Sequence, residues 1–199
     1  MVLALPRGGV PVGFEVARAL GAPLDVILVR KLGVPYQPEL GMGAIGEGGV
    51  RILDHSIVSS SGVGTEELGQ VEAQEQAELE RRAALYRGSR PRASLEGRIA
   101  LVVDDGIATG STARVACRVA RALGASRVVL AAPVGPRSAT HDLAEDADEV
   151  ILLDTPGSFV AIGRWYEDFS QVSDEEVERL LSLAAATAPE AAVRRGEVS

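Results

Sequence analysis

The chain is poor in the residues that build metal clusters and disulfides. It has one cysteine, Cys117, and two histidines, His55 and His141, among 199 residues. A lone cysteine forms neither an internal disulfide nor a Cys-x-x-Cys metal site, and two separated histidines do not favour a zinc site. We therefore expect a reducing, cytoplasmic setting and no structural metal.

Long apolar runs and a basic charge balance are missing as well. The apolar stretches Ile99–Val103 and 128–134 are far shorter than the roughly 20 residues of a membrane helix. No basic segment leads into an apolar stretch after Met1, so we expect neither a signal peptide nor a membrane partner. The 20 basic and 28 acidic residues give a net charge of −8. This charge disfavours nucleic acid as a partner, because such binding rests on neutralising phosphates.

The scarcity of lysine and of aromatic residues makes the few that are present informative. Lys31 is the only lysine, and the chain has only one Trp, three Tyr and three Phe. Three of these seven aromatic residues fall within the segment 165–169. That cluster is suited to stacking on a flat ligand, although a small hydrophobic plug at the sheet edge would use the same residues.

The remaining composition, 46% apolar and 24% charged, is that of an ordinary globular domain. Short apolar runs typical of strands buried on both faces alternate with helical patterns. We expect strands over 2–5, 26–29, 99–103, 127–132 and 150–153, and a short hairpin or irregular strands over 41–53. We expect helices over 12–20, 65–86, 112–123, 138–144 and 173–186. The alternation predicts an α/β fold with a central, mainly parallel sheet flanked by helices.

The boundaries of this fold are also predicted. We expect one domain over residues 1–186 and a flexible tail over 187–199. Because the chain begins almost inside a strand, we expect that a native N-terminal helix is missing.

The most specific signal is the sequence LVVDDGIATGST over residues 101–112. An apolar strand ends in Asp104 and Asp105, and a loop of glycine and hydroxyl residues then leads into a helix. In a parallel sheet such a loop lies at the carboxyl edge, where ligands bind. Gly106 and Gly110 allow the backbone N–H groups to turn inward, and the helix N-terminus favours an anion. The pattern predicts a phosphate monoester site, with two carboxylates in reach of a sugar diol or a hydrated Mg²⁺.

Other interpretations of this stretch fit less well. Asp104 and Asp105 taken alone would serve equally as a cap at the start of a helix and a surface carboxylate. The chain has no G-x-x-x-x-G-K-[ST], which excludes a P-loop, and no G-x-G-x-x-G after a strand, which excludes a Rossmann dinucleotide site. The D-x-D-x-[TV] pattern of a phosphatase-like domain with an aspartate nucleophile is absent too.

The sequence VVDDGIATGST over 102–112 resembles the PRPP-binding motif of the type I phosphoribosyltransferases (PRPP is 5-phosphoribosyl 1-pyrophosphate). The sequence LPRGGV over 5–10 resembles the pyrophosphate loop of that family, and RK at 30–31 resembles its basic pair. In position, 59–86 corresponds to its mobile loop and 159–169 to its base-binding hood. The pattern as a whole looks closest to a bacterial subgroup of predicted phosphoribosyltransferases.

The resemblance implies a single-domain fold of that family, with a mobile loop and a small C-terminal hood. It implies Mg²⁺-dependent transfer of phosphoribose from PRPP to a nitrogen nucleophile, a small heterocyclic acceptor such as a nucleobase, with release of pyrophosphate. The residues implied to be catalytic are Asp104, Asp105, Arg7 and Lys31. Those implied to bind the 5′-phosphate are Gly106, Ile107, Ala108, Thr109, Gly110, Ser111 and Thr112. Those implied to bind pyrophosphate are Pro6, Arg7, Gly8, Gly9, Arg30 and Lys31.

Several finer expectations follow from the same resemblance. Trp165 and Tyr166 would belong to the hood, and Asp104 and Asp105 would hold Mg²⁺ mainly through the ribose and water. A non-proline cis peptide is expected in the pyrophosphate loop, with the Arg7–Gly8 bond as the candidate. A homodimer is also expected. Family members that act on hypoxanthine or guanine usually carry Asp where this chain has Ala108, so a 6-oxopurine acceptor is disfavoured.

Some alternatives stay open at this point. The loop 6–9 could be a simple turn, the pair 30–31 a solvated strand end, and 65–86 a solvated helix. No general base is identifiable, with Glu39 or a glutamate of the mobile loop as the candidates. A non-catalytic PRPP-binding or nucleotide-binding regulator would use the same fold, but Arg7 and Lys31 favour the enzyme, because turnover needs them more than holding a nucleotide does.

Overall fold

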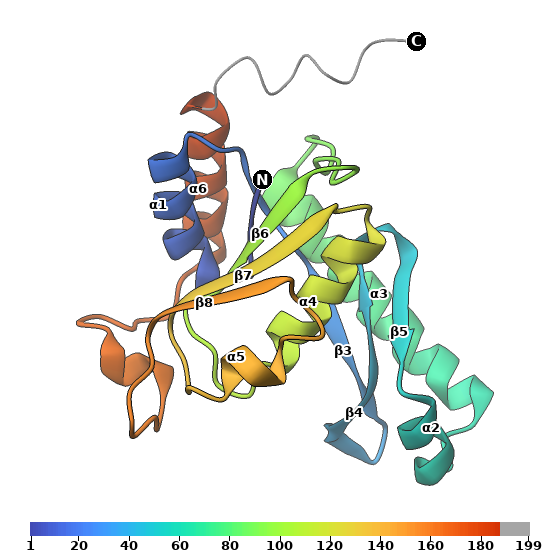
Figure 1. Ribbon diagram of the computed structural model, residues 1–199. Helices are drawn as coiled ribbons and strands as arrows, with labels where there is room; N and C mark the ends of the chain where they lie inside the picture. The colour runs from blue at the N-terminus through green and yellow to red at the C-terminus, as the bar shows by residue number, and fades with distance from the viewer. Residues whose placement is uncertain (188–199) are drawn as a thin grey trace.

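Five parallel strands form the central sheet of the computed structural model, which describes residues 1–187 (Figure 1). Their order across the sheet is β2 (Leu24–Val26), β1 (Val2–Ala4), β6 (Ile99–Val103), β7 (Arg127–Val134) and β8 (Glu149–Asp154). Every neighbouring pair is parallel. The predicted parallel α/β architecture is therefore confirmed.

Helices cover both faces of this sheet because its strands are apolar on both faces. On one face, α4 (Ser111–Ala122) packs its Ala116 against Ala100 and Val102 of β6, and α5 (Ala139–Asp142) lies beside it. On the other face, α1 (Gly9–Leu20) packs its Ala17 against Val103. The last helix, α6 (Asp174–Thr187), runs beside α1 (Figure 1).

A second sheet departs from the predicted strand pattern. The strand expected over 26–29 is interrupted: β2 ends at Val26, and β3 (Val29–Val34) pairs antiparallel with β4 (Gln37–Gly46). The short hairpin expected over 41–53 is confirmed: most of β4, the 3₁₀ turn η1 (Glu47–Gly49) and β5 (Val50–Leu53) form an antiparallel hairpin. These three strands stand between α3 and α4 (Figure 1).

The segment 59–86, which corresponds in position to the family's mobile loop, is mostly helical. It forms the end of α2 (His55–Ser61) and nearly all of α3 (Thr65–Arg87). The apolar side of α3 is buried through Leu68, Leu79 and Tyr86, in a core shared with the second sheet and α6. These apolar side chains are spaced for one helical face. The helix predicted over 65–86 is confirmed, and the mobility expected of this segment stays a prediction.

A buried ionic cluster fixes the end of α3. The guanidinium of Arg87 donates to Asp25 Oδ1 at 2.7 Å, to the Val26 carbonyl at 2.7 Å and to Glu47 Oε2 at 3.0 Å. All three charged side chains are buried. Glu47 also accepts from the Leu28 N–H at 3.3 Å. The cluster thus holds the link between β2 and β3, where the chain leaves the central sheet.

The remaining expectations concern the chain ends and the membrane. Within residues 1–187, none of the helices combines the length and apolar character of a membrane span. The tail predicted over 187–199 lies outside the described residues, apart from Thr187 at the end of α6.

The hood region contains one short element, the 3₁₀ turn η2 (Ile162–Trp165).

Candidate functional site

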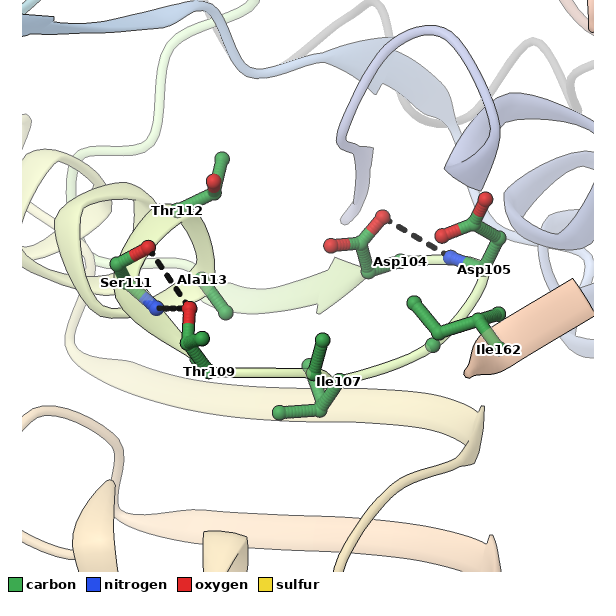
Figure 2. Close-up of a pocket in the computed structure, with 11 residues that line it drawn as sticks. Asp104, Asp105, Ile107, Thr109, Ser111, Thr112, Ala113 and Ile162 are labelled. Carbon is green, nitrogen blue, oxygen red and sulfur yellow. Dashed lines mark hydrogen bonds between the residues drawn. The ribbon is translucent and has the colours of Figure 1, made fainter. Parts of the chain in front are cut away.

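The loop between β6 and α4 encloses a hollow of about 170 Å³ at the carboxyl edge of the sheet (Figure 2). Its lining is the sequence from Asp104 to Ala113 together with Ile162, and we call it the phosphate hollow. The space suits a phosphate group better than a drug-sized molecule. All seven residues predicted to bind a 5′-phosphate, 106–112, line it.

The local sequence explains why this loop suits an anion. Gly110 caps α4 with a left-handed backbone, φ 73°, which favours glycine. It has no side chain to cap α4. The Ser111 N–H donates to Thr109 Oγ1 at 3.5 Å, and the N–H groups that follow it, with the positive end of the helix dipole, are offered to a ligand. The hydroxyls of Thr109 and Ser111 lie 3.1 Å apart beside them (Figure 2).

Asp104 and Asp105 stand at the other end of the same loop (Figure 2). The Asp105 N–H donates to Asp104 Oδ1 at 2.9 Å. Burial, and then the neighbouring Asp105 charge, raise the pKa of Asp104 well above its ordinary value. Burial also raises the pKa of Asp105. Two half-buried carboxylates with raised pKa values are stabilised by a cation or by hydroxyl donors, as the predicted metal and ribose roles require.

The predicted pyrophosphate loop crosses directly over these two carboxylates. It connects β1 to α1, and the Gly9 N–H donates to the Leu5 carbonyl at 3.0 Å. A Cβ built on Gly8 would stand 2.0 Å from Asp105 Oδ2, and one on Gly9 would stand 2.7 Å from the Val103 carbonyl oxygen. Glycine is therefore needed at both positions, and the structure brings the two predicted anion-binding loops together.

The cis peptide of this loop is one bond away from its predicted position. The non-proline cis bond joins Pro6 to Arg7, and the prediction of Arg7–Gly8 is wrong. Gly8 has a helical backbone, φ −58° and ψ −36°, as the residue that leads into α1.

The Arg7 side chain lies toward α6. Its Nη1 is 3.8 Å from Asp174 Oδ1, the first residue of that helix. The same Asp174 oxygen accepts from the buried Tyr86 hydroxyl at 2.6 Å. Arg7 is thus part of the loop over the two carboxylates, but its charge is paired with α6. No sequence pattern indicates this contact, because the sequence around Asp174 shows only an acidic residue in the first turn of a predicted helix.

The basic pair at 30–31 is divided between two faces of β3, as neighbouring residues of a strand are. Arg30 turns toward α3, where its Nε lies 2.6 Å from Glu75 Oε2. Lys31 donates to the Glu39 carbonyl at 3.0 Å and lies 3.9 Å from the Glu39 carboxylate. Glu39 is fully exposed at this hairpin. Neither Lys31 nor Glu39 lines the phosphate hollow, and their assignments stay predictions.

A second space, which we call the α3 groove, adjoins the phosphate hollow. Its lining comprises Leu5, Pro6, Ile27, Leu28, Val29, Arg30, Leu79, Arg82 and Thr112. Thr112 lines both spaces, so they lie on either side of one residue at the start of α4. Sequence reasoning missed Arg82, because an arginine on a helix rich in Glu, Gln and Arg carries no local signal.

The predicted hood contacts the phosphate loop through two residues. The Tyr166 hydroxyl donates to the Asp105 carbonyl at 2.6 Å, and Ile162 packs so closely that a Cβ on Gly106 would stand 2.7 Å from it. The Tyr166 ring also packs on Phe169, with ring centroids 5.2 Å apart. Trp165 is 44% exposed and Phe169 is 47% exposed, so both of these aromatic side chains keep free surface for stacking.

Comparison with known proteins places this arrangement in a family. The model of the phosphoribosyl transferase domain matches residues 1–167. Proteins of Mycobacterium tuberculosis strains CDC 1551 / Oshkosh and H37Rv, both named "Putative phosphoribosyl transferase", are 55% identical over 184 residues, 92% of this chain. TT1426 from Thermus thermophilus, known from a crystal structure, superposes with a TM-score of 0.81 at 44% identity, over 90% of this chain and 85% of that one.

The fold and these matches thus define a phosphoribosyltransferase-type domain, and the chain belongs to the phosphoribosyl transferase domain family. The chain spans 42% of the length of the mycobacterial relatives, less than half. The resemblance drawn from the sequence motifs is confirmed. The acceptor, the dependence on Mg²⁺, the homodimer and the cytoplasmic location stay predictions.

Proposed function

We propose that this domain binds PRPP and transfers its phosphoribosyl group to a nitrogen nucleophile, with release of pyrophosphate. The observation that carries the proposal is the close approach of Gly8 to Asp105. PRPP has anionic groups at two ends of one sugar, a 5′-phosphate and a 1-pyrophosphate. A site for it needs two anion-binding loops flanking groups that bind hydroxyls, and the contact between Gly8 and Asp105 supports that arrangement.

In this proposal each part of the site has a separate task. The N–H groups of 106–112 and the start of α4 bind the 5′-phosphate. Asp104 and Asp105 accept hydrogen bonds from the ribose hydroxyls and so orient the sugar. The loop 6–9 and the Arg30 guanidinium offset the negative charge that develops on pyrophosphate as its bond to C1 breaks. Such stabilisation of the leaving group is the largest contribution expected from the protein.

The carboxylates also fit Mg²⁺ when it enters with the substrate. Among residues 1–187 no three His, Cys, Asp or Glu side chains gather into a metal site. Asp104 and Asp105 offer hard oxygen donors, and Mg²⁺ is commonly held by one or two carboxylates, water and substrate phosphates. A bound Mg²⁺ would supply charge neutralisation at the pyrophosphate.

A flat nitrogen heterocycle is the acceptor class that the site favours. The half-exposed Trp165 ring lies in the segment that Tyr166 ties to the phosphate loop, where it could stack on a base. Ala108 has no exchangeable proton, so it gives no help to the proton transfer that a 6-oxopurine needs.

The test is a calorimetric titration of PRPP with and without Mg²⁺, on the wild-type chain and on Asp104→Asn/Asp105→Asn. We expect tight, Mg²⁺-dependent binding that the double variant loses. A panel of nucleobases with pyrophosphate release as the readout then tests transfer. PRPP binding without transfer to any of them would favour the non-catalytic regulator, and absence of binding by the wild type would refute the proposal.

A further inference from the structure

The α3 groove contains two arginines whose charges are only partly used inside the protein. Arg30 donates through its Nε to Glu75 at 2.6 Å, and Arg82 donates through its Nε to Glu78 at 2.7 Å. Within residues 1–187, the Nη groups of both side chains have no hydrogen-bond partner. A guanidinium has five N–H donors, so each of these arginines can bind an anion without giving up its carboxylate.

The position of the groove indicates which anion it would meet. Pro6, at the start of the predicted pyrophosphate loop, lies in its wall, and Thr112 lines both it and the phosphate hollow. A ligand whose phosphate occupies that hollow therefore meets this groove on the side of the pyrophosphate loop. The free space is only about 30 Å³, enough for one or two water-sized groups. A space of this size excludes a nucleobase and holds one or two of the terminal oxygens of a pyrophosphate, with the rest of the group outside the groove.

We infer that Arg82 of α3, together with Arg30 of β3, binds the terminal phosphoryl group of the pyrophosphate on PRPP. This inference rests on the proposed function. Arginine suits the role because its planar fork binds phosphate oxygens in pairs. The helix α3 then contributes directly to substrate binding.

The neighbouring arginine provides a matched control. Arg81 donates to the same carboxylate, Glu78, at 2.8 and 3.1 Å, but it does not line the groove. Hydrogen bonds from Arg81 and Arg82 together lower the pKa of Glu78 to about 2. Arg81→Gln and Arg82→Gln therefore remove the same kind of bond from one glutamate, and only Arg82→Gln removes a donor from the groove.

The experiment measures the affinity of the 199-residue chain for PRPP and for ribose 5-phosphate in Mg²⁺, by calorimetry. Ribose 5-phosphate keeps the sugar and the 5′-phosphate and lacks the pyrophosphate. We expect Arg82→Gln to weaken PRPP binding about tenfold or more, as for the loss of a charge-assisted hydrogen bond. Its ribose 5-phosphate affinity should stay within about twofold of wild type, and Arg81→Gln should change neither affinity by more than that.

Three results would overturn the inference. Equal PRPP affinities for Arg82→Gln and Arg81→Gln would show that Arg82 does not bind PRPP. That result would leave the proposed function intact. Equal losses of PRPP and ribose 5-phosphate affinity in Arg82→Gln would indicate a general structural effect. A wild-type chain that binds neither PRPP nor ribose 5-phosphate would refute the proposed function together with this inference. Thermal unfolding of both variants verifies that they fold.

Discussion

The hydroxyl of Tyr166 donates a hydrogen bond to the backbone carbonyl of Asp105 across 2.6 Å. It ties the hood segment to the loop that carries the two carboxylates. Burial, followed by the charges of Asp105 and Asp104, raises the pKa of Tyr166 to about 12. The phenol therefore keeps its proton, and can donate this bond, throughout the neutral range.

Removing this hydroxyl should loosen the hood without unfolding the domain. We expect Tyr166→Phe to lower the free energy of unfolding by about 1 kcal/mol, the ordinary contribution of one hydrogen bond. PRPP binding should weaken several-fold, because the Asp105 peptide loses a support. Tyr36→Phe is the control, since Tyr36 donates to the Ser61 carbonyl, outside both the phosphate hollow and the α3 groove. Equal effects of the two variants on PRPP affinity would contradict this role for Tyr166.

A single methyl group on the pyrophosphate loop should disturb the carboxylates below it. The helical backbone of Gly8 accepts alanine, but the new Cβ would stand 2.0 Å from Asp105 Oδ2. We expect Gly8→Ala to fold and to lose PRPP affinity by about tenfold or more, because a misplaced binding group is costly.

Calorimetry on Gly8→Ala and on Gly69→Ala separates this steric effect from a general effect of alanine. Gly69 lies in α3 with no atom within 4 Å of a built Cβ. Gly69→Ala should keep its PRPP affinity and gain stability by up to about 1 kcal/mol, the difference in helix propensity. Unchanged PRPP affinity in Gly8→Ala would show that the loop can move away from Asp105 freely.

Local sequence was sufficient for the parts of the site that local physics determines. The strand Ile99–Val103 has the predicted bounds, because an apolar run followed by two carboxylates and a glycine has few other conformations. The loop 106–112 likewise follows from its glycines and the helix after it. The division of Arg30 from Lys31 was not predicted. The strand was expected to end at residue 29, whereas β3 continues through both residues and turns their side chains to opposite faces.

The parts that the sequence did not predict depend on contacts between distant segments. The apolar run from 26 to 29 shows no break, and the chain leaves the central sheet there because Glu47 and Arg87 bind the Leu28 N–H and the Val26 carbonyl. The contact of Arg7 with Asp174 joins the pyrophosphate loop to α6, and no pattern around either residue encodes it. The 65–86 segment was predicted as a helix, but its packing against the core was not.

The buried cluster around Arg87 should be essential for stability. Arg87→Met leaves Asp25 and Glu47 buried without their common cation, and removing one partner of a buried ion pair costs about 3–5 kcal/mol. Urea unfolding should show that loss. Arg51→Met is the control, because Arg51 pairs with Glu72 at 2.6 Å at a half-exposed site and such pairs contribute about 0–1 kcal/mol. Similar midpoints for the two variants would refute the structural role of the cluster.

The ligand-free protein should gain stability when Asp104 is neutralised. Burial and the Asp105 charge raise the pKa of Asp104 from 3.8 to about 7. Between those values the native state holds a proton that the unfolded chain has released. The contribution of Asp104 to the free energy of unfolding is therefore fully present below about pH 4. It is lost as the pH rises toward 7. Asp104→Asn removes that loss, so the variant should be more stable than wild type at pH 8, with the difference shrinking toward pH 4.

The expected size of this stability difference, and a control variant for it, follow from the same link between pKa and stability. A tenfold change in proton affinity corresponds to about 1.4 kcal/mol, and partial exposure of the site reduces the effect, so we expect about 1–3 kcal/mol at pH 8. Asp148→Asn should behave oppositely, because the Val128 N–H and Arg121 lower the pKa of Asp148. That variant should be less stable than wild type at pH 8 and should match it at acid pH. Thermal unfolding from pH 4 to pH 8 without Mg²⁺ measures both trends, and an Asp104→Asn difference that does not vary with pH would contradict the raised pKa.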